Sequence, residues 1–329
     1  MRFDVEVPTS REGIHVPIPF AGHKEIIKTI KLAERLGYNA VWGTDFMTPS
    51  PSMGILEKQP PNWYELLICL AYAAAVTKRV KLGTGAILLP YRDVILLAKQ
   101  VATLDHFSNG RLLLGLALGG FRDEFEAIRP RDKKANRGKM MDEQIEALHL
   151  LLSHDKGEVS FKGQYVEFQG VNLNPKPLQR PLPIYMPGRN PDAVERIARW
   201  GLGYMIRASD ARERLETIRP VLEKYGKSPS EIDVTVEAQL SLAKTHEAAV
   251  DFYRNSHLAH SNLKRQDIGT IVANNWIGTP DEVIEKIAHV KELGITHFIA
   301  LHLAGDTVAE SWEQMQIFAE DVIPHAKIA

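Results

Sequence analysis

The sequence contains one cysteine among its 329 residues and has a formal net charge of only −1. A single thiol, Cys69, excludes an intrachain disulfide bond, as is usual for proteins of the reducing cytosol. The near-zero net charge provides no basic surface of the kind that nucleic acid requires. We therefore expect a cytoplasmic protein that does not bind nucleic acid.

Long apolar segments are also missing. The longest apolar run, residues 66–76, is shorter than the roughly 20 residues needed to cross a bilayer. The first residues carry charges at Arg2, Asp4 and Glu6 instead of the apolar core of a signal peptide. We predict no membrane association, and a buried helix over residues 66–76.

Several catalytic motifs are absent. The sequence contains no H-E-x-x-H, C-x-x-C or G-x-S-x-G, and neither "GTGAIL" nor "GLALGG" completes the dinucleotide fingerprint G-x-G-x-x-G. We therefore predict no metal site and no Ser-His-Asp chemistry.

Short runs rich in Val, Ile and Leu alternate with helix-like segments along the chain. The predicted strands lie near residues 2–8, 39–44, 79–87, 111–118, 183–187, 202–207, 231–241 and 296–303. The predicted helices lie near residues 24–37, 64–76, 94–107, 138–153, 190–200, 210–225, 246–258, 279–293 and 308–320. Such alternation is typical of parallel βαβ units, and eight strands in a chain of this length indicate an α/β fold, a (β/α)8 TIM barrel.

No change of composition marks a linker, so we predict a single domain over residues 1–329. The additional length lies in three segments at the C-terminal rim of the barrel, namely 46–63, 154–182 and 255–278. The start of the second segment is predicted to form a small hairpin, and the third to be irregular. Loops of this kind form substrate lids in barrel enzymes.

Functional groups of a parallel barrel lie at the C-terminal ends of its strands. Candidates at these positions and in the loop after the second strand are Asp45, Phe46, Trp63, Thr84, Gly85, Ala86, Gly119, Gly188, Arg189, Arg207, Glu237 and His302. On the fourth strand, small residues at 115, 117 and 119 leave one face nearly bare, with room for a flat or bulky ligand.

Two of these strand ends allow more than one interpretation. Gly188 and Arg189 precede a helix start at Asn190-Pro191, which suits a phosphate, although an ordinary capped loop is the alternative. On the seventh strand, polar residues alternate from 233 to 241 around Glu237. They predict a polar barrel interior that faces either a ligand or a satisfied structural network.

Taken together, the motifs resemble the bacterial luciferase-like family of flavin-dependent barrels. The resemblance depends on an ordered set of segments that covers nearly the whole chain: "AERLGYNAVWGTD" (33–45), "VKLGTGAILLPYRDVILLAKQVATLDHFSNGRLLLGLALG" (80–119), "FRDEFEAI" (121–128), "FKGQYVEFQGVNLNPKPLQRPLPIYMPGR" (161–189) and "IGTPDEVIEKI" (277–287).

The resemblance implies roles for several of these residues. The third strand end would lie against a flavin ring, with a non-proline cis peptide at Gly85–Ala86 or a neighbour, and Thr84 and Gly119 would also contact the cofactor. Gly188 and Arg189 would hold its phosphate. Many members carry a histidine after the second strand, whereas this chain has Phe46, which cannot perform acid–base chemistry.

The resemblance therefore implies a two-component monooxygenase that uses reduced FMN and O2 on a small organic substrate. A separate flavin reductase and a homodimer are expected with it. Asp45 and His302 are the catalytic candidates, and Phe46, Trp63, Arg207 and Glu237 are the candidates for substrate binding. The alternatives are hydride transfer with the deazaflavin coenzyme F420, and a flavin-binding protein without turnover.

Overall fold

The computed structural model describes residues 1–56, 58–155 and 157–328. Residues 57 and 156, which fall within predicted insertions, and residue 329 lie outside this description. In the described part of the chain, eight parallel strands close into a barrel. These strands are β1 (Arg2–Val7), β2 (Ala40–Gly43), β3 (Lys81–Thr84), β5 (Leu112–Ala117), β8 (Ile184–Pro187), β9 (Gly203–Arg207), β10 (Val234–Leu242) and β12 (His297–Leu303). Pairing of β9 with β10 closes the ring.

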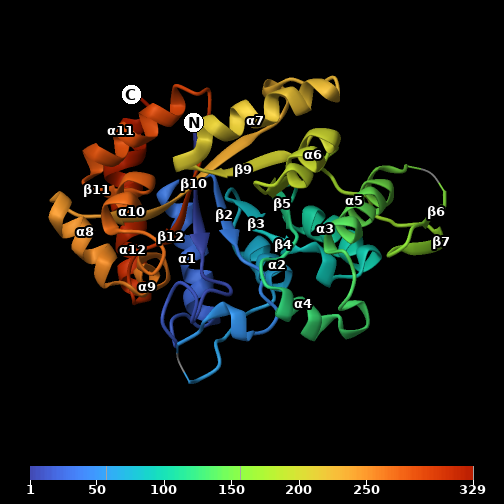
Figure 1. The fold of residues 1–329 in the computed structure, drawn as a ribbon, viewed down its shortest axis with the longest axis horizontal. Helices are drawn as coiled ribbons and strands as arrows, with labels where there is room; N and C mark the ends of the chain where they lie inside the picture. The colour runs from blue at the N-terminus through green and yellow to red at the C-terminus, as the bar shows by residue number, and fades with distance from the viewer. Residues whose placement is uncertain (57, 156, 329) are drawn as a thin grey trace.

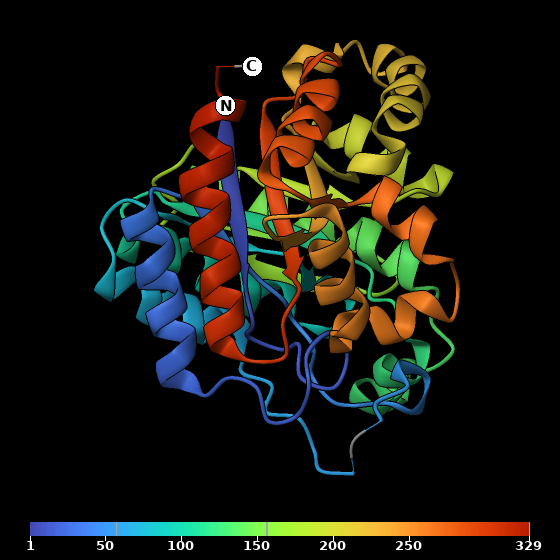
Figure 2. The ribbon, with the colours of Figure 1, turned by 90° about the vertical axis from the view of Figure 1, so that its left-hand side faces the viewer.

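Helices surround the barrel and cover the outer faces of its strands (Figure 1). They are α1 (His23–Leu36), α2 (Leu66–Val76), α3 (Val94–Phe107), α5 (Arg137–Ser153), α6 (Pro191–Trp200), α7 (Ala211–Lys224), α8 (His246–Asn255), α11 (Pro280–Lys291) and α12 (Val308–Ile317), which continues through a π-helical turn into α13 (Ile323–Ala326). Figure 2 shows α12 running beside α1 and in front of β1, with the two ends of the chain close together.

Each of the eight predicted strands is present, and each predicted helix matches an observed helix within a few residues. The hairpin predicted near 154–170 is confirmed as β6 (Val159–Lys162) and β7 (Glu167–Val171), which project from the barrel (Figure 1). The irregular structure predicted for 255–278 is wrong. That segment forms α9 (His257–Leu263), α10 (Ile268–Asn274) and β11 (Trp276–Gly278), which bury a small apolar cluster against α8.

Two further elements were not predicted as separate units. Strand β4 (Ile87–Leu88) pairs with β5, and helix α4 (Arg122–Ile128) follows β5. Both are short, and their apolar residues do not extend far enough to show a period. They lie where the chain leaves the barrel at its C-terminal rim.

The helix over 66–76 exists, but the prediction that it is buried is only half correct. The side chains of Leu66 and Leu70 are fully buried, whereas Ile68 and Tyr72 are 67% and 58% exposed. The apolar composition correctly predicted a helix. It does not require burial on all sides, since folded proteins keep much apolar surface in contact with water.

The bare face predicted on the fourth strand has a different cause. A Cβ atom at Gly115 would collide with the main-chain carbonyl of Thr84 on β3. Thr84 Oγ1 donates to the carbonyl oxygen of Gly115 and accepts from its N–H, both at 2.8 Å. The small residue at 115 therefore permits close packing of β3 against β5 rather than space for a ligand.

A buried ionic network closes the N-terminal end of the barrel. His297 Nε2 lies 2.6 Å from Asp4 Oδ2, and its Nδ1 lies 3.1 Å from Asp233 Oδ2. Arg2 and Tyr185 also donate to Asp233. Burial disfavours the charged imidazole, but the two carboxylates outweigh it and raise the pKa of His297 above 6.5. The raised pKa favours the protonated histidine, which connects Asp4 on β1 with Asp233 at the start of β10 across the barrel floor.

We predict that His297→Leu lowers the free energy of unfolding by about 3–5 kcal/mol, because it leaves buried carboxylates without their partner. A group whose pKa is raised in the folded state stabilises most below its unfolded pKa, here 6.5, and loses that contribution as the pH rises through the folded value. Urea unfolding across this pH range should therefore show the largest difference at the acidic end. His289→Leu, an exposed histidine on α11, serves as the control, and a difference independent of pH would contradict the charged state.

Candidate functional site

A cavity of about 600 Å³ opens at the C-terminal ends of the barrel strands. Its walls come from the ends of β9, β10 and β12, from the loops after β1, β2, β5 and β8, and from the segment α9–α10. The volume lies within the range of roughly 300–1,000 Å³ that is usual for sites of small molecules and cofactors. Its position matches the place where barrel enzymes carry their active sites.

Five of the residues predicted from the sequence meet in this cavity. They are Phe46, Arg189, Arg207, Glu237 and His302. They arrive from five different strands, so their assembly depends on the closure of the barrel. Glu237 and Arg207 are register partners on β10 and β9, which sets them side by side in the wall.

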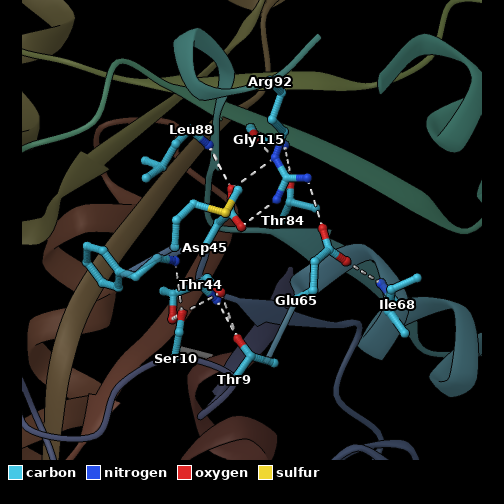
Figure 3. A network of polar contacts seen from close by, with 12 residues as sticks. Thr9, Ser10, Thr44, Asp45, Glu65, Ile68, Thr84, Leu88, Arg92 and Gly115 are labelled. Atoms are coloured by element: carbon cyan, nitrogen blue, oxygen red, sulfur yellow. Dashed lines mark hydrogen bonds and ion pairs between the residues drawn. The ribbon is translucent and has the colours of Figure 1, made fainter. Parts of the chain in front are cut away.

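Asp45 and Thr84 lie in a network of polar contacts at the strand ends (Figure 3). Arg92 Nη2 donates to Asp45 Oδ1 at 2.7 Å, and the N–H of Leu88 donates to Asp45 Oδ2 at 3.0 Å. Arg92 also pairs with Glu65, which caps the N-terminus of α2 at Ile68. Both oxygens of Asp45 are therefore used to fix the turn after β3.

The neighbouring contacts fix the main chain that carries Phe46. Thr9 Oγ1 donates to the carbonyl oxygen of Thr44 and accepts from its N–H, and Ser10 Oγ donates to the same carbonyl (Figure 3). The N–H of Phe46 in turn donates to Ser10 Oγ at 3.3 Å. The chain after β1 thus positions the chain after β2.

The Gly85–Ala86 peptide bond is cis, as the resemblance predicts. Gly119, which has φ of +87°, lies against Tyr91, whose hydroxyl would be 2.8 Å from a Cβ at that position. Tyr91 donates to the carbonyl oxygen of Phe121, a residue of the cavity wall. The absence of a side chain at Gly119 therefore leaves room for Tyr91, which holds the main chain of Phe121 by its hydrogen bond.

Aromatic side chains form one side of the cavity. The ring of Phe46 lies 5.3 Å from Trp63 and 6.0 Å from Phe121, measured between centroids. Trp63 stands behind Phe46 and donates from Nε1 to the carbonyl oxygen of Glu12 at 3.1 Å. Phe46 and Phe121 thus form an apolar part of the cavity wall, with Trp63 packed against Phe46.

Arginines from three elements gather near the start of α6: Arg189 in the loop after β8, Arg207 at the end of β9 and Arg214 on α7. Asn190 caps the helix by accepting from the N–H of Ala193 at 2.8 Å. A Cβ at Gly188 would collide with that of Ala193, so the loop can approach the helix closely. Arg189 is half exposed and pairs with Asp210 at 2.6 Å, and Arg214 also contacts Asp210. Arg189, Arg207 and Arg214 all line the cavity, a donor set that suits a phosphate.

Glu6, Arg11 and His15 are functional candidates that the sequence prediction omitted. Glu6 ends β1 and is buried, and its two oxygens accept from Arg11 Nε and from the N–H and Nδ1 of His302. His15 stacks on His302 with ring centroids 4.1 Å apart. Burial opposes the ionisation of Glu6, yet Arg11 and His302 lower its pKa to about 2. Charged residues directly after the first strand were the available signal.

Glu237 is the other unusual carboxyl group of the cavity. Burial raises the pKa of Glu237 to about 7, while Arg207 and Arg11 oppose this shift. Within the described residues, no group of three or more His, Cys, Asp or Glu side chains could hold a metal ion, and no helix is long and apolar enough to span a membrane.

The fold and the cavity at the strand ends define a (β/α)8-barrel enzyme. A profile of the luciferase-like monooxygenases matches residues 1–297. The chain belongs to the luciferase-like monooxygenase family, and it is an oxidoreductase of that family.

The similar proteins differ from one another in the reaction that their names describe. The chain is 25% identical to an F420-dependent glucose-6-phosphate dehydrogenase of Amycolatopsis mediterranei, over 92% of this chain and 94% of that enzyme. It is 31% identical to the oxygenase component of a flavin-dependent trigonelline monooxygenase of Acinetobacter baylyi, over 53% of this chain and 45% of that enzyme. The structure of the monooxygenase RslO1 from Streptomyces bottropensis superposes with a TM-score of 0.79 and 26% identity, covering 99% of both chains.

We predict that Glu237→Gln increases the free energy of unfolding at neutral and alkaline pH. A pKa raised from 4.5 to about 7 means that stability falls as the pH rises between these values, because the unfolded chain releases its proton first. The glutamine avoids this loss, so the variant should gain roughly 3 kcal/mol above pH 7 and little below pH 4.5. Urea unfolding at several pH values measures the effect.

The matched control is Glu213→Gln, an exposed carboxylate of the same cavity. It should leave the unfolding free energy nearly unchanged at each pH. An equal gain for both variants would show that Glu237 has an ordinary pKa.

Proposed function

We propose that the protein is the oxygenase of a two-component flavin-dependent monooxygenase, which uses reduced FMN and O2 on a small organic substrate. The observation that carries this proposal is Phe46, an aromatic side chain at the strand end where the resemblance implies a histidine in many members of the family. Likeness over the full chain to RslO1 and the identity to the trigonelline enzyme support the same chemistry.

The residues present fit FMN. Arg189 and Arg214 would hold the phosphate, since both guanidinium groups line the cavity beside the start of α6. The main chain at Gly85 and Ala86 and the ring of Phe46 would border the isoalloxazine. Reduced FMN, when bound, supplies the two electrons with which one atom of O2 enters the substrate and the other leaves as water.

The side chains of this protein have three tasks in the reaction. Phe46, Trp63 and Phe121 exclude water from the place of oxygen transfer, which protects reduced flavin and substrate from side reactions. Arg207 and Glu237 provide polar contacts for the substrate from neighbouring strands. Asp45 positions the turn after β3, and His302 handles a proton at its Nε2.

A second candidate is hydride transfer with coenzyme F420. The similarity over most of the chain to an F420-dependent dehydrogenase favours hydride transfer. The phosphate of F420 would suit the same arginines. It requires a proton donor or acceptor near the coenzyme, a role that Phe46 cannot fill. A separate flavin reductase, assembly as a homodimer and a cytoplasmic location remain predictions from the resemblance and composition.

We predict that Arg189→Ala weakens the binding of FMN by roughly 10- to 100-fold, the loss of one charge-assisted hydrogen bond of about 1.5–3 kcal/mol. Riboflavin, which lacks the phosphate, should bind the variant and the wild type equally. Anaerobic fluorescence titration with each reduced flavin measures both constants. Arg199→Ala, in the last turn of the same helix, should change neither. Equal weakening of both flavins would contradict a phosphate contact.

We predict that the product carries one atom from isotopically heavy O2 when a flavin reductase supplies reduced FMN and small aromatic compounds serve as substrates. Mass spectrometry of the product measures the label. Turnover with reduced or oxidised F420 under strict exclusion of oxygen is the parallel experiment. Unlabelled product together with anaerobic turnover would replace the monooxygenase by the F420-dependent reaction.

A further inference from the structure

The two stacked histidines at the end of β12 and in the loop after β1 have opposite polarity. Arg11 Nη1 lies 3.0 Å from His15 Nδ1, and a guanidinium group can only donate, so His15 Nδ1 accepts. The proton of a neutral His15 must then be on Nε2. Arg11 therefore makes His15 a donor toward the cavity that it lines.

Glu6 has the opposite effect on His302. A carboxylate can only accept, so His302 Nδ1, 3.0 Å from Glu6 Oε2, carries a proton. The Nε2 atom of a neutral His302 then keeps a free lone pair. The stacked pair thus offers one donor and one acceptor from rings that lie 4.1 Å apart and are inclined by 16°.

Burial and the nearby Arg11 both favour the neutral form of each ring. Burial lowers the pKa of His15, and His302 and Arg11 lower it further. Burial and Arg11 also lower the pKa of His302, against the effect of Glu6. The charged or titratable groups that act on the pair are Glu6 on β1, Arg11 after β1, Arg207 on β9 and His257 on α9. Glu237 on β10 acts on Arg11 and Arg207.

We propose that this pair binds and deprotonates a weakly acidic hydroxyl group of the substrate, of the phenol or enol class. This inference rests on the proposed function and names its substrate class. A hydroxyl oxygen satisfies both histidines at once, because it donates its hydrogen to His302 Nε2 and accepts from His15 Nε2–H. The adjacent rings of Phe46 and Phe121 suit an aromatic body.

The proton transfer is balanced within the site. The substrate O–H bond breaks and its electron pair stays on oxygen, while a new N–H bond forms at His302 Nε2. The resulting imidazolium faces the Glu6 carboxylate through Nδ1, and the oxyanion keeps the hydrogen bond from His15. Glu6 and Arg11 act as positioning residues, in the way that a carboxylate orients a catalytic histidine.

Asparagine substitutions of His302 and His15 form a matched pair of variants. His302 has φ of +59°, a conformation in which asparagine is better tolerated than most residues. His302→Asn can still donate to Glu6 from its amide but lacks the Nε2 base. His15→Asn can still accept from Arg11 through its carbonyl but lacks the Nε2–H donor. Each variant therefore removes one half of the pair and keeps its anchor.

The test uses 4-nitrophenol, whose absorption spectrum distinguishes phenol from phenolate, and the protein without any flavin. Spectra of the bound probe are recorded from about pH 5 to pH 8, the range in which imidazoles titrate. In the wild type the apparent pKa of the bound probe should lie at least about one unit below that of the free probe, a tenfold gain in phenolate. His302→Asn should abolish this shift, and His15→Asn should remove most of it.

Two controls make the result decisive. His289→Asn on the surface should keep the full shift, and 4-nitroanisole, the methyl ether of the probe, should bind the wild type more weakly than 4-nitrophenol. A bound probe with an unshifted pKa, or a shift that survives in both cavity variants, would overturn the proposal. Because the assay contains no flavin, either failure leaves the monooxygenase reaction to be judged by the isotope experiment alone.

Discussion

Two carboxylates on the first strand organise both ends of this barrel. Phe3, Val5 and Val7 of β1 pack against the surrounding helices, so the alternation of a strand turns Asp4 and Glu6 inward. A buried carboxylate is costly unless it is paired and hydrogen-bonded. Asp4 accepts hydrogen bonds from His297, Trp42 and Asn39, and these contacts close the N-terminal end of the barrel. Glu6 accepts from Arg11 and His302, and these contacts hold His302 in the wall of the cavity.

The same need for partners explains why the loop after β1 is so firmly held. Arg11 donates to Glu6. Glu12 accepts from the N–H groups of Phe20, Ala21 and Asn62. The loop therefore connects the first strand to the segment that carries Trp63, while Thr9 and Ser10 fix the chain before Phe46. The aromatic wall and the histidine pair are thus positioned by contacts from one loop, the loop after β1.

The strands and most helices could be predicted because hydrophobic period and helix caps are local signals. Thr279 and Glu282, for example, form the capping box that begins α11, and Pro280 occupies its first helical position. The role of Asp45 could not be predicted, since Arg92 reaches it from a separate turn. Ser241 also departs from the predicted polar face, because its hydroxyl donates to the carbonyl oxygen of Ala249 in α8. Position at a strand end identifies a candidate, whereas contacts across the fold decide what it does.

His302 shows how a small irregularity creates a functional group. Phe298 and Ala300 of β12 face the helices, while Ile299 and Leu301 face inward, so simple alternation would place His302 among the helices. The register between β10 and β12 shifts before Leu303, and the positive φ of His302 changes its direction. Bulges of this kind redirect side chains beside active sites. The barrel is therefore adapted at single strand ends: Phe46 after β2 carries no titratable proton, whereas His302 on β12 supplies a titratable group on the other side of β1.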